Sequence, residues 1–121
     1  MSNAENFLTR YLDAWRTVDA DVVRSIFAPD AIYRGRAYDT EPDEGIDAIV
    51  AMWDDEQDAP GTWSYEGGVI EMETADAAVI RGTTSYTEGP KQGVYDNLWL
   101  VRFDGAGRAT EFWDWWVERK H

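Results

Sequence analysis

The sequence contains no cysteine, and its single histidine is the last residue, His121. Without cysteine the chain has no disulfide, no thiolate metal ligand and no cysteine nucleophile. The position of the histidine argues against a histidine-based triad and a histidine-rich metal site. No apolar run approaches the roughly 20 residues that span a bilayer, and no signal peptide is recognisable. These absences fit a cytoplasmic protein and argue against a thiolate or histidine metal site, and we expect neither a metal nor an organic cofactor.

Basic residues are also scarce. Eleven Lys and Arg residues stand against 24 Asp and Glu residues, which gives a formal net charge of −13. Nucleic acid and anionic membranes would repel such a chain, so neither is expected as a partner. The acidic run at 54–58 lacks the spacing of a calcium-binding loop, and a solvated surface explains it better. With 121 residues, the chain is expected to form one domain over residues 1–121.

The first half of the chain has helical periodicity. Ser2 and Glu5 have the spacing of a capping box, which predicts a helix from there to about Val18. A second helix follows and is expected to end at Ala28-Pro29-Asp30. A third helix is predicted over about Gly45–Glu56, because its apolar residues recur on one stripe. These patterns predict three amphipathic helices before most of the strands.

The second half has the alternation of strands. A short extended run at 31–34 comes early, and longer strands are predicted at 62–73, at 77–87 and in a terminal hairpin at 95–118. Gly67-Gly68, in the middle of the first long strand, indicates a bulge or bend. Helices gathered before a meander of strands predict an α+β fold with a mostly antiparallel sheet.

The terminal hairpin turns at Asp104-Gly105-Ala106-Gly107, where Gly and Asp supply the positive φ values that tight turns need. Strand residues alternate between faces, so if the two strands pair with an odd register sum, which fits this turn, one face of the hairpin carries a lone carboxylate, Asp114, among aromatic neighbours. Its other members are Tyr95, Asn97, Trp99, Val101, Phe103, Phe112 and Trp116. Burial among rings disfavours the charged form of a carboxyl group, which suits a general acid or base.

The opposite face of the hairpin is also apolar and needs a cover of its own. It carries Leu98, Leu100, Trp113, Trp115 and Val117. We expect a homodimer through this outer sheet face, centred on Trp113 and Trp115, because aromatic residues are favoured at interfaces and an isologous contact covers both copies.

Four segments of the chain carry a family resemblance: the first helix with its inward Tyr and Trp, the connector Phe27-Ala28-Pro29-Asp30-Ala31, the helix opening at Gly45-Ile46, and the closing Phe103-Asp104-Gly105-Ala106-Gly107-Arg108. Together they resemble the SnoaL-like proteins of the nuclear transport factor 2-like superfamily. The resemblance implies a strongly bent, mostly antiparallel sheet on which three helices pack to form a cone, and the mouth of the cone holds a small apolar ligand. It implies the fold more specifically than an activity, since the superfamily hosts isomerases, dehydratases, cyclases, epoxide hydrolases and non-catalytic binders.

Two enzyme branches of that superfamily can be compared with this chain. For the ketosteroid-isomerase branch, Tyr11 matches the helix tyrosine, but Gly35 and Trp99 stand near the positions of the base and the acid. For the limonene-epoxide-hydrolase branch, the segment Phe112-Trp113-Asp114-Trp115-Trp116 matches the closing motif. Arg81 would supply its arginine, whereas Thr83 stands where a second aspartate belongs. Both constellations are therefore incomplete.

Asp114, Arg81 and Tyr11 are the candidate catalytic residues. Asp114 would transfer a proton, Arg81 would position or polarise the substrate, and Tyr11 would donate a hydrogen bond. A structural alternative exists for each, because Asp114 and Arg81 could form an ion pair and Tyr11 could be a core residue with a satisfied hydroxyl group.

The candidate ligand-binding residues are expected to line an aromatic pocket: Trp15, Tyr33, Trp53, Thr83, Asn97, Trp99, Phe112 and Trp116. Core packing explains the aromatic members equally well. The function predicted from the sequence is binding of a small hydrophobic molecule, with or without cofactor-independent acid–base catalysis. A non-catalytic carrier and a protein-interaction homodimer stay open as alternatives.

Overall fold

The computed structural model describes residues 2–59 and 61–119, so His121 lies outside the described residues. Within those ranges the chain forms three helices and six strands. In chain order the elements are α1 (Asn3–Thr17), α2 (Ala20–Ile26), β1 (Phe27–Arg34), β2 (Asp43–Glu44), α3 (Ile46–Asp55), β3 (Trp63–Glu73), β4 (Ala77–Tyr86), β5 (Gly93–Phe103) and β6 (Ala109–Glu118).

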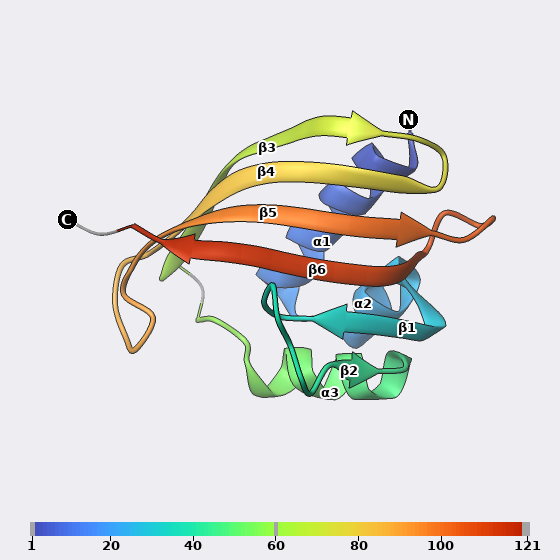
Figure 1. The fold of residues 1–121 in the computed structure, drawn as a ribbon. Coiled ribbons are helices and arrows are strands. Elements are labelled where there is room, and N and C mark those ends of the chain that lie inside the picture. Colours follow the sequence, from blue (N-terminus) through green and yellow to red (C-terminus); the bar gives the residue numbers. More distant parts are fainter. Residues whose placement is uncertain (1, 60, 120–121) are drawn as a thin grey trace.

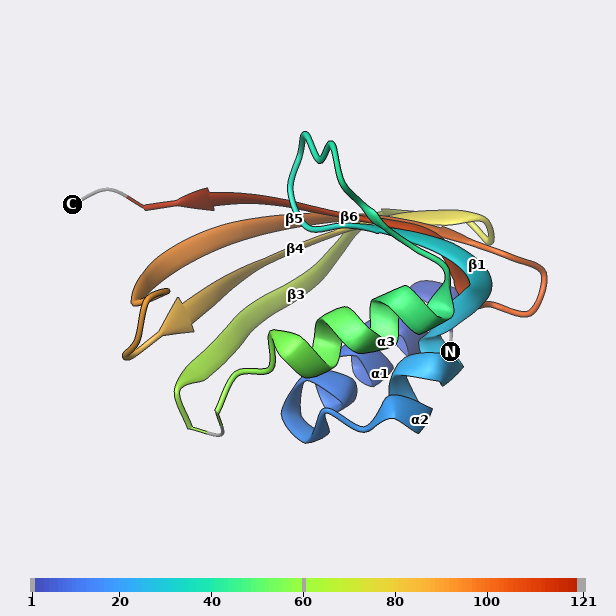
Figure 2. The same ribbon diagram turned by 90° about the horizontal axis from the view of Figure 1, so that it is seen from below.

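All the strands belong to one sheet with the order β2-β1-β6-β5-β4-β3. Strand β1 pairs with β6 in parallel, while the other neighbours pair antiparallel, so the sheet is mixed. The sheet is curved, and the three helices lie together on one side of it (Figures 1 and 2). The predicted α+β class is confirmed, and the full cone remains a prediction.

The helix termini follow from local sequence. The Ser2 hydroxyl oxygen accepts a hydrogen bond from the Glu5 amide, and the Glu5 carboxylate accepts one from the Ser2 amide, as the predicted capping box requires. Asp19 caps α2 by accepting a hydrogen bond from the Asp21 amide. Helix α1 ends at Val18, whose φ of 51° lies in the left-handed region. That conformation is unusual for a β-branched residue.

The boundary between α2 and β1 differs from the prediction. The sequence predicted that the helix includes Phe27 and breaks at Pro29, but β1 already begins at Phe27. Phe27 pairs with Ala109 and Ile32 pairs with Glu111, with a register irregularity between the two pairs. Pro29 lies inside this irregular stretch, where the ladder does not require its missing N–H group. A long-range pairing with β6 therefore overrides the local helical pattern.

The faces of the terminal hairpin are as predicted. Trp99 pairs with Asp114, and Val101 pairs with Phe112, so these side chains share one face of the sheet. Trp99 and Phe112 are fully buried against the helices. The predicted bulge in β3 is also present, because the register of β3 against β4 shifts across Gly67 and Gly68, between Glu66 and Val69. The helix-facing side of the sheet is therefore the inner face, and it carries Asp114.

Candidate functional site

A cavity of about 320 Å³ opens between the helices and the inner face of the sheet. Its wall includes eight of the eleven residues that the sequence nominated as site residues. These are Tyr11, Trp15, Tyr33, Trp53, Asn97, Trp99, Asp114 and Trp116. A volume of this size accepts a small organic molecule.

Asp114 is the acidic group on the sheet side of the cavity. Burial raises the pKa of its carboxyl group to about 6, and a hydrogen bond from Asn97 partly opposes that rise. The Asn97 side-chain amide donates to Asp114 Oδ1 over 3.1 Å. The Trp99 indole also lowers the pKa of Asp114, although its N–H makes no hydrogen bond of ordinary geometry within the described part of the chain. Desolvation is the dominant effect, as in carboxyl groups that exchange protons near neutral pH.

A short hydrogen-bonded relay orients the amide that faces Asp114. The Thr84 hydroxyl group donates to Asn97 Oδ1 over 2.6 Å, and the Asn97 NH₂ group then faces the carboxylate. Thr84 and Asn97 are the buried polar residues of the core. Adjacent strands β4 and β5 supply the two side chains, so the sheet itself holds the relay in place.

Tyr11 and Tyr33 form a second polar group in the cavity. Their hydroxyl oxygens are 2.8 Å apart, and both side chains are buried. Burial is the main reason that the pKa of each phenol is raised, and the charge of Asp114 contributes to both shifts. The two phenols therefore stay protonated. Their mutual hydrogen bond uses one of two O–H groups, which leaves one proton for a ligand atom.

The rest of the wall is largely aromatic. The Tyr11 ring packs against Trp99 and Trp53, with centroids 4.5 and 5.0 Å away. Tyr86 and Tyr95 extend the wall toward the open end, where Trp116 packs edge-on against Tyr95. These contacts join α1, α3 and the sheet in one aromatic lining.

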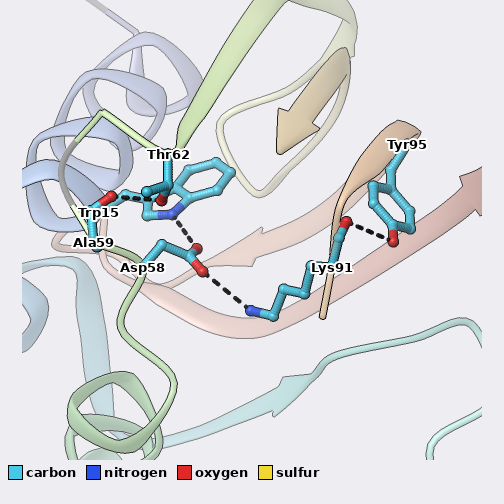
Figure 3. Close-up of polar contacts among 6 residues, drawn as sticks. All are labelled: Trp15, Asp58, Ala59, Thr62, Lys91 and Tyr95. Carbon is cyan, nitrogen blue, oxygen red and sulfur yellow. Dashed lines mark hydrogen bonds and ion pairs between the residues drawn. The ribbon is translucent and has the colours of Figure 1, made fainter. Parts of the chain in front are cut away.

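The open end of the cavity is closed in part by Asp58, from the segment that follows α3. Asp58 Oδ2 accepts a hydrogen bond from the Trp15 indole over 3.0 Å, and Asp58 Oδ1 pairs with Lys91 Nζ over 3.3 Å (Figure 3). The Tyr95 hydroxyl group donates to the Lys91 carbonyl oxygen over 2.9 Å. Asp58 thereby connects helix α1 to the turn between β4 and β5.

Arg81 does not reach this site, which corrects the sequence-based assignment. Arg81 pairs with Leu98 in the ladder, whereas Ile80 pairs with Trp99, so Arg81 points to the outer face. There it forms an ion pair of 3.2 Å with Glu71. Arg81 was assigned to the site by family resemblance, whereas the pairing of Ile80 with Trp99 puts the next residue, Arg81, on the opposite face.

Thr83 and Phe112 also lie outside the cavity wall. Thr83 shares the outer face with Arg81 and donates a hydrogen bond to Asp96 over 3.0 Å. Phe112 has the predicted orientation but is completely buried, and it stacks on Tyr33 with a centroid distance of 4.8 Å. Phe112 therefore packs beneath Tyr33, a residue of the cavity wall, and is not positioned to touch a ligand.

Several wall residues were not predicted from the sequence, among them Thr84, Tyr86, Lys91 and Asp58. The alternation of β4 was sufficient to find Thr84 and Tyr86, since both have the parity of buried Ile80. No local pattern marks Asp58 or Lys91, because they meet only through the tertiary fold. In the described ranges, 2–59 and 61–119, no three acidic or histidine side chains are arranged to hold a metal ion.

The curved mixed sheet, the helices on one side and the cavity between them are features of the nuclear transport factor 2-like superfamily. A family model for the SnoaL-like domain matches residues 8–117. The chain therefore belongs to the SnoaL-like domain family. No curated protein matches the sequence.

Solved structures with the same fold are distant in sequence. RV0760c from Mycobacterium tuberculosis is 14% identical, with a TM-score of 0.76 over 97% of this chain and 92% of that one. A steroid delta-isomerase from Pseudomonas aeruginosa is 16% identical, with a TM-score of 0.68 over 97% and 81%. An LEH-like epoxide hydrolase from M. tuberculosis is 19% identical, with a TM-score of 0.69 over 95% and 79%. At these identities the likeness concerns the fold alone.

Proposed function

We propose that the chain binds a small hydrophobic molecule in the cavity and that Asp114 acts on it as a general base, without a metal or organic cofactor. The observation that carries the proposal is a carboxyl group with a pKa of about 6 in the wall of an aromatic cavity. Such a group is mostly ionised at neutral pH and yet basic enough to accept a proton in a transition state. The cavity serves as the mouth of the cone that the family resemblance implies.

The remaining polar groups suit a reaction in which negative charge develops on a ligand oxygen. The free proton of the Tyr11–Tyr33 pair can be donated to that oxygen. The Thr84–Asn97 relay holds Asp114 in one orientation, so that its second oxygen, Oδ2, is available to the ligand. Tyr11 keeps the donor role that the sequence analysis gave it, and Tyr33 shares it.

Isomerisation, dehydration or cyclisation is favoured over epoxide hydrolysis. A steroid delta-isomerase and an LEH-like epoxide hydrolase share the fold. An Asp–Arg–Asp relay for activating water would need Arg81 beside Asp114, but Arg81 is on the other side of the sheet. A single base with neutral hydroxyl donors supports proton transfer within the ligand instead.

The test is the variant Asp114→Asn. It keeps the shape of the side chain and an oxygen that can accept from Asn97, but it cannot accept a proton from a ligand. We expect turnover to fall by about 100-fold or more, while ligand affinity, measured by quenching of tryptophan fluorescence, stays within about threefold. Equal turnover by the variant and the wild type would remove Asp114 from the chemistry.

A carrier that binds without turnover is the second candidate. The carrier is favoured because Asp114 is the single acidic group in the deep part of the cavity. Gly35 and Trp99, which cannot transfer protons as carboxyl groups do, stand near the positions where the ketosteroid-isomerase branch has its base and its acid. The carrier predicts tight binding with no product for any ligand, and an unchanged affinity in Asp114→Asn.

We also propose that the outer face of the sheet is the contact between two copies of the chain. Trp115 on this face is 45% exposed, and Val117 and Met72 are 69% and 70% exposed. Trp113 lies beneath the Arg34 guanidinium, whose Cζ atom is 4.4 Å from the centroid of the Trp113 ring. This face also carries charged groups, such as the Arg81–Glu71 ion pair, and exposed apolar side chains among polar ones are typical of an interface. The loop between β1 and β2 rises on this same side, away from the helices (Figure 2).

A further inference from the structure

The cavity wall carries a net negative charge. Its acidic residues are Asp114, Glu56 and Asp58, and Lys91 is its only basic residue among the described ranges of the chain. Lys91 is already paired with Asp58 over 3.3 Å. Two carboxylates, Glu56 and Asp114, are left without a cationic partner in the described structure. An anionic ligand would therefore meet uncompensated like charge on entry.

Together with burial, the negative charges of Asp114 and Glu56 raise the pKa of a tyrosine in the cavity wall. Burial is the first cause of the raised pKa of Tyr33, and the charges of Asp114 and Glu56 add to it. For Tyr86, burial is again first, and the charges of Asp58 and Asp114 add to the rise. The wall residues therefore experience negative potential from the sheet side and from the open end.

The aromatic rings of the wall favour the same sign of ligand charge. Eight aromatic side chains contribute to the lining. The negative faces of tyrosine and tryptophan rings attract a cation, and desolvation strengthens the attraction. Aromatic rings with nearby carboxylates are a recognised way to hold an organic ammonium group.

We infer that the ligand of this cavity is a small organic cation, an amine protonated at neutral pH and carried on an apolar skeleton. This inference rests on the proposed ligand-binding function and narrows it. The ammonium group lies toward the open end near Glu56, since Asp58 is occupied by Lys91 and Trp15. The apolar skeleton fills the aromatic interior, which leaves Asp114 free to act on the ligand at its far end.

The test uses three probes with one skeleton: protonated adamantan-1-amine, adamantan-1-ol and adamantane-1-carboxylate. Each is titrated into the wild-type protein at neutral pH, with tryptophan fluorescence and calorimetry as the readouts. We expect the amine to bind about tenfold more tightly than the alcohol, and the carboxylate to bind at least about tenfold more weakly than the alcohol. An alcohol or carboxylate that binds as tightly as the amine would overturn the inference.

A pair of variants locates the charge that matters. Glu56→Gln should weaken binding of the amine by about threefold and leave the alcohol unchanged, because Glu56 is solvent-exposed at the open end. Asp54→Asn is the matched control, since it removes the same charge from the same helix end but does not line the cavity. Equal effects of the two variants would assign the preference to net charge alone and contradict a specific site at Glu56.

The result also separates this inference from the proposed function. Binding of the alcohol without preference for the amine would overturn the cation site and leave the ligand cavity intact. Failure of all three probes to bind would overturn both.

Discussion

At the scale of single residues, the burial that would suit Asp114 to proton transfer also lowers the stability of the folded chain. The pKa of its carboxyl group is about 6 in the folded chain, above its ordinary value of 3.8, because burial penalises the charged form. Folding therefore favours the protonated acid. This destabilisation is absent only well below pH 3.8, grows as the pH rises from there toward 6, and is complete above the folded pKa.

The variant Asp114→Asn should accordingly be more stable than the wild type at about pH 7.5 by on the order of 1–2 kcal/mol. The neutral amide has no charge to desolvate, and its oxygen still accepts a hydrogen bond from Asn97. At about pH 2.5 the difference should nearly vanish, because Asp114 is then almost fully protonated in both the folded and the unfolded chain. Urea unfolding at the two pH values measures this, and an equal difference at both would contradict the raised pKa.

The same group predicts the pH dependence of activity. If Asp114 is the base, the rate should rise with pH through a midpoint near 6, where its carboxyl group loses the proton. A rate measured at saturating substrate reports the group in the complex, and kcat/KM reports the free protein. The Asp114→Asn variant is the control, since any residual activity should lack this midpoint.

Gly82 is a second residue with a specific requirement. A Cβ atom at this position would overlap the Tyr65 phenol ring, with Tyr65 Cε1 only 2.6 Å away. Tyr65 itself stacks on Trp99 with a centroid distance of 4.8 Å, so it cannot move without disturbing the cavity wall. Gly82→Ala should cost about 1–3 kcal/mol of unfolding free energy.

Gly105→Ala is the matched control for that substitution. No heavy atom lies within 4 Å of a Cβ built on Gly105. Its cost should stay within about 0.5 kcal/mol. Denaturant unfolding compares the two variants, and similar losses would show that the close approach of Tyr65 is not the cause.

At the scale of elements, Asp58 joins two loops that are far apart in sequence. The segment after α3 and the turn between β4 and β5 are connected through its ion pair with Lys91, and α1 is connected through Trp15. Asp58→Asn should loosen both loops together. We expect faster hydrogen exchange at the Thr62 and Gln92 amides, whose backbone hydrogen bonds lie within the two loops.

Asp54→Asn serves again as the control, because in the described part of the chain the Asp54 carboxylate forms no ion pair with Lys91 and no hydrogen bond to Trp15. The global stability of Asp58→Asn should fall by on the order of 1 kcal/mol, since Lys91 is half-exposed although the Asp58 side chain is only 15% exposed. Acceleration at only one of the two amides would mean that Asp58 does not couple the loops.

The elements also show which parts of the fold can be predicted from local sequence patterns. Capping at Ser2, the α1 stripe and the two faces of the β5–β6 hairpin were predictable, because each depends on short-range spacing. The start of β1 at Phe27 and the two-residue strand β2 were not, since both depend on partners distant in sequence. Asp114 was found because residues alternate between faces along the hairpin strands. Arg81 was assigned to the wrong face, because the assignment followed family resemblance and not the pairing of β4 with β5.

At the scale of the whole molecule, the outer sheet face predicts association. A Trp115→Glu variant should be monomeric at concentrations where the wild type is a dimer, because it places charge in the centre of the apolar surface. Sedimentation equilibrium measures the difference. Ala51→Glu, on the exposed side of α3, adds the same charge away from this face and should leave the dimer intact. A wild-type chain that is monomeric throughout would contradict the interface.

Two structural constraints act on Val18, one on its backbone conformation and one on its side chain. Its backbone adopts a conformation better suited to asparagine or glycine, while its side chain forms part of the cavity wall. A glycine or asparagine that relaxed the helix end would also remove the valine side chain from a residue that lines the cavity. Any attempt to engineer a more robust version of this chain at Val18 would therefore trade ligand affinity for ease of folding.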